Sequence, residues 1–180
     1  GSAYLSLQKE DASYRDMGRA ELKRALELDP GNADTVELLA RDQWAAGLEK
    51  QESGSRQEGE ELEKAATALV ASALEKCPAD KAKDRGRLER LLAFYNLIKG
   101  DFDKAISALQ SLAAQQSGEA GAETQLMLGA IYSGSVYGNN RMDFDKAEEC
   151  MKKAMGLDPT DGRAYQGLSQ IYKVKREKEK

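Results

Sequence analysis

The side chains that most often carry enzyme chemistry are scarce in this chain. Its 180 residues include no histidine and two cysteines. Histidine is the commonest general base and transition-metal ligand, so its absence excludes Ser-His and Cys-His nucleophilic pairs. Cys77 and Cys150 are 73 residues apart, which fits no metal-binding spacing, and we expect both to be small buried side chains. We therefore predict no catalytic residue, no cofactor and no metal site, and a protein that is not an enzyme.

One oxygen-rich group of residues also fails as a ligand set. Asn139, Asn140, Asp143 and Asp145 could offer oxygen atoms to calcium. Their order matches no calcium-binding loop, and the glutamate that such a loop needs is missing at the required distance. The chain also has no G-x-x-x-x-G-K-[ST] loop and no G-x-G-x-x-G motif after a strand, so phosphate-binding loops are excluded. A binding surface is what remains for function.

The composition is that of a folded protein with an acidic balance. The chain is 41% hydrophobic and 32% charged, and its net charge is −4. Disordered chains are usually poorer in apolar residues. A protein that binds duplex nucleic acid usually carries a basic excess, so we expect no nucleic-acid partner. No stretch approaches the roughly 20 apolar residues that span a bilayer, so we expect no membrane insertion.

The start of the chain bears on its location in the cell. Gly1-Ser2 is typical of a cloning scar, and no initiator methionine is present. We therefore expect the native N-terminus to be missing. A cytoplasmic location is slightly favoured, and an exported bacterial protein is the alternative.

A repeated pentapeptide indicates the elements that must form any binding surface. Asp-Phe-Asp-Lys-Ala stands at residues 101–105 and again at 143–147, which is 42 residues apart. A repeat at this period indicates one supersecondary unit copied along the chain. Gly100 before the first copy fits a left-handed helix end, and the first aspartate of each copy fits a helix N-cap. The pentapeptide is thus interpreted as a helix–turn–helix junction and not as a pair of catalytic aspartates.

The rest of the chain is predicted to be helical. Apolar residues follow the i, i+3, i+4 rhythm, and no run alternates with period two, so we expect no β-strands. Pro30, Pro78 and Pro159 each end a helix, and a fourth break falls at 117–118. The side chains placed to cap the helices after the prolines are those of Asn32, Asp80 and Asp161.

This pattern resembles the tetratricopeptide repeat family. Ala147, Met151, Ala154 and Pro159 stand at the family's spacing for the second helix of a repeat. The first-helix pattern is matched by Leu128, Gly129 and Tyr132, with Gln125 at the position of a bulky residue, and other copies are recognisable along nearly the whole chain. These other matches are Ala25 with Pro30, Ala66 with Val70, Ala73 and Pro78, Ala105 with Leu109 and Leu112, and Tyr165 with Leu168, Ser169 and Tyr172.

The resemblance implies an all-α fold. It would be a right-handed α-solenoid of about four antiparallel helix pairs plus a terminal capping helix, forming a single domain over residues 1–180. The expected units are approximately 3–30, 31–78, 79–118 and 119–159, with the terminal helix at 161–178.

The resemblance also implies a non-enzymatic scaffold for protein–protein interaction. In the family the first helices line a concave groove, and here that groove would take a peptide or helix of a partner protein. Arginine and aromatic side chains suit such a partner. Trp44 has two interpretations, as a groove anchor or as a side chain packed against the helix of the inserted segment. The expected groove residues are Arg41, Trp44, Arg87, Arg90, Phe94, Arg163, Gln166 and Gln170, joined by Leu126 and Ala130.

The sequence leaves open an alternative function and the role of two inserted segments. The alternative function is a structural spacer or a self-associating module of a larger bacterial envelope or secretion assembly, so the oligomeric state is undecided. Two segments, 49–61 and 133–140, lengthen the chain beyond the family's period. They are interpreted either as longer helices with a longer turn or as additional contact surfaces.

Overall fold

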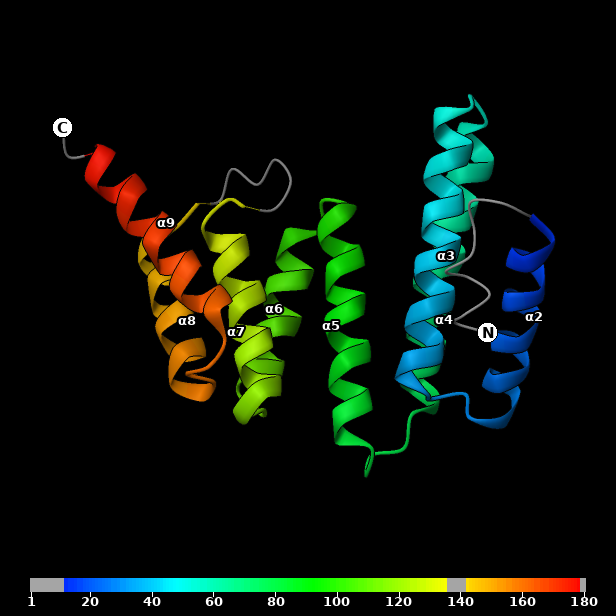
Figure 1. The fold of residues 1–180 in the computed structure, drawn as a ribbon, viewed down its shortest axis with the longest axis horizontal. Helices are drawn as coiled ribbons and strands as arrows, with labels where there is room; N and C mark the ends of the chain where they lie inside the picture. Colours follow the sequence, from blue (N-terminus) through cyan, green and yellow to red (C-terminus); the bar gives the residue numbers. More distant parts are fainter. Residues whose placement is uncertain (1–11, 136–141, 179–180) are drawn as a thin grey trace. The chain divides into compact units, whose positions relative to one another are not determined.

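The computed structural model describes residues 12–135 and 142–178, and all regular structure in these ranges is helical (Figure 1). Adjacent helices pack in pairs, most extensively α3 with α4 and α7 with α8. The all-α prediction is confirmed, and the pairing is that of a tetratricopeptide-like solenoid. The helices are α2 (Ala12–Leu28), α3 (Ala33–Glu52), α4 (Arg56–Lys76), α5 (Ala82–Ile98), α6 (Phe102–Ala113), α7 (Gly118–Tyr132), α8 (Phe144–Leu157) and α9 (Gly162–Lys178).

The chain divides into two compact units, Gly1–Leu92 and Ala93–Lys180, with the boundary inside α5. The prediction that residues 1–180 form one domain with four repeat units stays a prediction. Among the described helices, none combines the length and the apolar character needed to cross a membrane.

The first unit is built on the long hairpin of α3 and α4. Gly47 and Gly59 let these helices approach closely, because a Cβ atom on Gly47 would lie 2.8 Å from the carbonyl oxygen of Gly59. Gly54, with φ of 90°, makes the turn between them. The segment 49–61 therefore lengthens two helices, as one of its two interpretations predicted, but the turn between them is short where that interpretation expected a longer turn. Most of the segment 133–140 lies outside the described residues.

Helix α2 is held to α3 by apolar and ionic contacts. Leu22 and Leu39 are buried against each other. On α3, three residues after Leu39, the buried Asp42 accepts hydrogen bonds from both Arg15 and Arg19 of α2. A buried carboxylate is tolerated when charged donors satisfy it, so this cluster fixes the position of α2 along α3.

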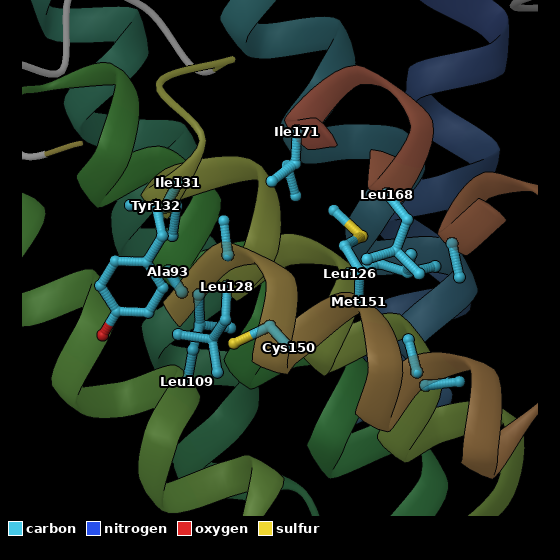
Figure 2. Close-up of a cluster of buried hydrophobic side chains, with 14 of the residues drawn as sticks. Ala93, Leu109, Leu126, Leu128, Ile131, Tyr132, Cys150, Met151, Leu168 and Ile171 are labelled. Carbon is cyan, nitrogen blue, oxygen red and sulfur yellow. The ribbon is translucent and has the colours of Figure 1, made fainter. Parts of the chain in front are cut away.

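The second unit has one continuous apolar core, drawn in Figure 2. It combines Leu109 of α6, Leu128 and Ile131 of α7, Met151 of α8 and Leu168 of α9. Each helix contributes a stripe of small and large apolar residues, and the large residues fill the space that the small residues leave.

The junctions between helices follow local sequence signals, with one difference. Gly100 adopts the predicted left-handed conformation, with φ of 84°. The side chain of Asp143 accepts the hydrogen bond from the backbone N–H of Lys146 at 3.0 Å, as expected for an N-cap. Asp101 holds the same position in the first pentapeptide, yet its side chain makes no capping bond. The backbone ψ at Asp101 is 55°, against 91° at Asp143, so identical residues are presented differently.

Capping hydrogen bonds are present at two of the three side chains that were predicted to cap helices after the prolines. Asn32 accepts from the backbone N–H of Thr35 at 2.9 Å, and Asp161 accepts from that of Arg163 at 2.9 Å. Cys77 and Cys150 are both free and buried, as predicted. Burial raises the pKa of the Cys150 thiol to about 11, so this thiol stays protonated and unreactive at neutral pH.

Candidate functional site

Helices α7 and α9 of the second unit flank a groove of about 370 Å³ whose floor includes α8. The groove contains the predicted residues Arg163, Gln166 and Gln170, all on α9. Across from them, α7 contributes the expected residues Leu126 and Ala130. Its remaining lining residues are Ser133, Ser135, Phe144, Met151, Gly167, Ile171 and Val174.

The helical register of α9 explains why these side chains face the groove. The core side of α9 buries Ala164, Leu168 and Ile171. Gln166 and Gln170 are one turn apart on another side of the helix and are exposed. They form a polar rim beside an apolar floor.

The floor of the groove depends on the side chain of Met151. A Cβ atom on Gly129 would lie 2.7 Å from Cε of Met151, and a Cβ atom on Gly167 would lie 2.7 Å from both Sδ and Cε. The end of the Met151 side chain therefore occupies space that two glycines leave free on α7 and α9. Figure 2 shows Met151 beside Leu126 and Leu168 in this arrangement.

The single arginine among the groove's lining residues is already paired. Arg163 donates from Nη2 to Asp161 at 2.6 Å and from Nε at 3.0 Å, and Nη2 lies 4.0 Å from Glu123. The hydrogen bonds from Arg163 lower the pKa of Asp161, so this carboxylate stays ionised over a wide pH range. The groove therefore presents amide and apolar groups more strongly than charge.

In the first unit, the predicted arginines of the binding surface bind acidic neighbours. Arg87 of α5 donates to Asp34 at 2.5 Å and to Glu37 at 2.9 Å, both on α3. Burial alone would lower the pKa of Arg87, but these two hydrogen bonds outweigh it and raise the pKa. Arg41 pairs with Glu37 at 2.6 Å and is otherwise exposed. A partner carboxylate would have to compete with these internal acids.

Two of the predicted surface residues lie inside the first unit. Trp44 is 8% exposed and Arg90 is 9% exposed, so the structure leaves little of either for a partner. Trp44 and Gly47 are both among the buried residues of α3, and Gly47 lies close to α4. The burial of Trp44 agrees with the interpretation as a packed side chain, and a role for Trp44 or Arg90 in partner binding stays a prediction.

Phe94 belongs to the second unit and stays at the surface, 38% exposed, with its ring centroid 6.0 Å from that of Tyr95. The structure groups Arg163, Gln166 and Gln170 around one hollow, and it places Arg41 and Arg87 in an ion-pair cluster of the other unit. A role for any of them in partner binding stays a prediction.

Sequence reasoning missed several residues of the groove. Phe144 was interpreted as part of a junction, and Met151 as a match to the family's spacing for a second helix, although both line the groove. The available signal was the pair of glycines, Gly129 and Gly167, whose lack of side chains leaves the space that the end of Met151 occupies. No pattern in the sequence indicated that Ser133, Ser135 or Val174 would line the groove.

A comparison with protein families supports the resemblance. The model for the tetratricopeptide repeat matches residues 122–161, which hold most of α7, all of α8 and the turn before α9. No match was found among curated proteins. Repeats of this family are typical of protein–protein interaction modules without enzymatic activity. Residues 122–161 thus match a tetratricopeptide repeat, which supports the resemblance of the chain to this family.

Proposed function

We propose that this protein is a non-enzymatic scaffold that holds a segment of a partner protein in the α7–α9 groove. The observation that carries the proposal is the groove itself, about 370 Å³ in volume, with a floor of Leu126, Met151 and Ile171. Buried apolar floors with a polar rim are typical of peptide-binding grooves.

The groove favours a partner segment that is amphipathic and carries little charge. The apolar floor accepts aliphatic or aromatic side chains. The amides of Gln166 and Gln170 each donate and accept hydrogen bonds, so they can bind backbone N–H and C=O groups of an extended segment or polar side chains of a helix. Arg163 is held by Asp161, which makes it a weak attractant for acidic residues.

The test is site-specific photo-crosslinking. A benzoylphenylalanine at position 166 should capture a partner that mass spectrometry identifies, and the same residue at the exposed Ser111 of α6 should not. Ala130→Trp, which fills the groove opposite Gln166, should remove the adduct while the circular dichroism spectrum stays helical. An adduct that forms equally from both positions, or that survives Ala130→Trp, contradicts the proposal.

Self-association is a second candidate, because α9 leaves aromatic side chains uncovered. Tyr165 is 48% exposed and Tyr172 is 46% exposed, both on α9. Sedimentation velocity over a range of concentrations tests this candidate. A mass that rises with concentration in the parent protein, but not in Tyr165→Glu, would support it.

A further inference from the structure

A second hollow, of about 500 Å³, lies in the same unit between α6 and α8, with α7 as its floor. It shares no lining residue with the α7–α9 groove. Its floor and walls combine apolar groups with amide, hydroxyl and charged groups. The lining residues are Gln110, Ala113, Ala114, Gln125, Leu128, Tyr132, Lys146, Glu149, Cys150 and Lys153.

Gln125 is the unusual member of this lining. Its side chain is only 8% exposed, yet its amide makes no hydrogen bond to any part of the chain that the structure describes. The amide atoms of Gln125 are not fully buried, so they reach the solvent that fills the hollow. The amide of Gln125 therefore offers a donor and an acceptor that a molecule in the hollow can use.

The repeat in the sequence indicates which kind of chemical group could occupy the hollow beside Gln125. Leu128 and Tyr132 of α7 correspond to Leu168 and Tyr172 of α9, each 40 residues later. By the same offset Gln125 corresponds to Tyr165. An aromatic side chain thus stands in α9 where α7 carries the smaller glutamine, and we expect a ring at position 125 to extend into the hollow that Gln125 lines.

The edges of the hollow are polar but carry paired charges. Lys146 binds Asp143 at 3.1 Å, and Lys153 binds Glu149 at 2.7 Å. The Tyr132 hydroxyl accepts a hydrogen bond from Nε2 of Gln110 at 3.0 Å. With both lysines neutralised by acids, the site favours a neutral ligand over an anion.

The apolar part of the hollow suits a flat ring. Leu128 and Cys150 lie together in the core drawn in Figure 2, and the ring of Tyr132 lies at the edge of that cluster. Ala113 and Ala114 at the end of α6 add small side chains that leave the space open. A ring could therefore rest on Leu128 while its polar edge reaches Gln125.

We propose that this hollow is a second binding site, which accepts a neutral aromatic group carrying one N–H or O–H, such as an indole or a phenol. Gln125 would bind the polar edge of the ring, and Leu128 with the α6 alanines would contact its faces. The source that we assign is a Trp or Tyr side chain of a partner protein, because the surrounding rim offers further polar contacts to a polypeptide.

The test is an NMR titration of the full chain with indole and with N-acetyltryptophanamide. We expect both to shift the side-chain amide signals of Gln125 and the backbone amides of Leu128 and Cys150. Tighter binding of the tryptophan amide assigns the site to a protein side chain, whereas tighter binding of indole assigns it to a free small aromatic molecule. Absence of shifts with both probes overturns the proposal.

Two variants of Gln125 locate the binding. Gln125→Tyr fills the hollow with the residue that α9 carries at the equivalent position, and it should weaken indole binding at least tenfold. Gln125→Leu keeps the hollow open but removes the amide, and it should weaken binding about threefold to tenfold, the effect of one lost hydrogen bond. Circular dichroism confirms that each variant folds. Unchanged affinity in a folded Gln125→Tyr variant overturns the assignment.

Ala130→Trp is the matched control, because it fills the α7–α9 groove and leaves this hollow intact. It should leave indole binding within twofold of the parent value. Loss of indole binding in this control would place the probe in the groove and would overturn the second site without affecting the proposed groove.

Discussion

The sulfur of Met151 lies 2.7 Å from the point where a Cβ atom on Gly167 would stand. The same side chain is confined on its other side, because Cε of Met151 would lie 2.7 Å from a Cβ atom on Gly129. Met151 therefore cannot yield to a larger residue at either position without disturbing the other contact. The packing of α8 against α9 and the depth of the groove rest on this arrangement.

A double-mutant cycle should separate the two effects of a methyl group at Gly167. Alanine is the better helix former by about 1 kcal/mol, whereas overpacking a core costs about 1–3 kcal/mol. Gly167→Ala should therefore lower the free energy of unfolding in the parent protein and raise it in a Met151→Ala background. Urea unfolding measures both. The same effect in the two backgrounds would show that Met151 does not limit this position.

A close helix crossing should make Gly59 intolerant of substitution. A Cβ atom there would lie 2.5 Å from the carbonyl oxygen of Gly47 and 3.2 Å from the backbone nitrogen of Gln51. Backbone atoms cannot move aside cheaply, so Gly59→Ala should lower the free energy of unfolding by about 2 kcal/mol. Gly156 of α8 is the control, because no atom lies within 4 Å of its added Cβ. Gly156→Ala should raise stability by up to about 1 kcal/mol, and equal losses at both glycines would contradict this account.

The buried Asp42 should be the most sensitive charged residue of the first unit. It accepts hydrogen bonds from Arg15 and Arg19, which are themselves partly buried. Asp42→Ala leaves both arginines without their carboxylate and should cost about 3 kcal/mol in the free energy of unfolding. Glu58→Gln removes an exposed partner of Lys50 and should cost less than about 0.5 kcal/mol. Similar losses in the two variants would argue against a special role for Asp42.

Acid should weaken the contact between α8 and α9. Glu148 accepts hydrogen bonds from Lys152, Lys175 and Tyr172, and these bonds lower its pKa from 4.5 to about 2. Because the pKa is lower in the folded state, the stabilising contribution is complete above pH 4.5 and is lost as the pH falls toward 2. Urea unfolding between pH 6 and 2 should show a shallower loss in Glu148→Gln than in the parent. Glu52→Gln, which changes an exposed glutamate outside the network, should retain the parent profile.

Much of the helical structure could be predicted from local sequence. The prolines, Gly100 and the Ser117-Gly118 break act through their own backbone preferences, so helix ends near them were predicted correctly. Local sequence does not predict which of the two identical pentapeptides caps its helix with a side chain. Asp143 caps its helix and Asp101 does not, because the backbone torsion angles of the two aspartates differ.

Part of the groove could be predicted from the helical periodicity of the sequence. Helical periodicity puts Arg163, Gln166 and Gln170 on the sides of α9 that the core does not use, and the structure places all three around one hollow. The same reasoning also proposed Trp44 and Arg90 as surface residues, and both are buried. Periodicity identifies a face of a helix, but the neighbouring helices decide how much of that face they cover.

The sequence by itself therefore determined the all-helical class, the helix breaks and the resemblance to tetratricopeptide repeats, because these depend on residue preferences and spacings within one or two turns. Only the tertiary structure decided that Arg87 pairs with Asp34 and Glu37, that Met151 fills the space beside two glycines and that Gln125 faces a hollow. Ion pairing, burial and cavities arise between residues far apart in the chain, and they follow from which helices pack together.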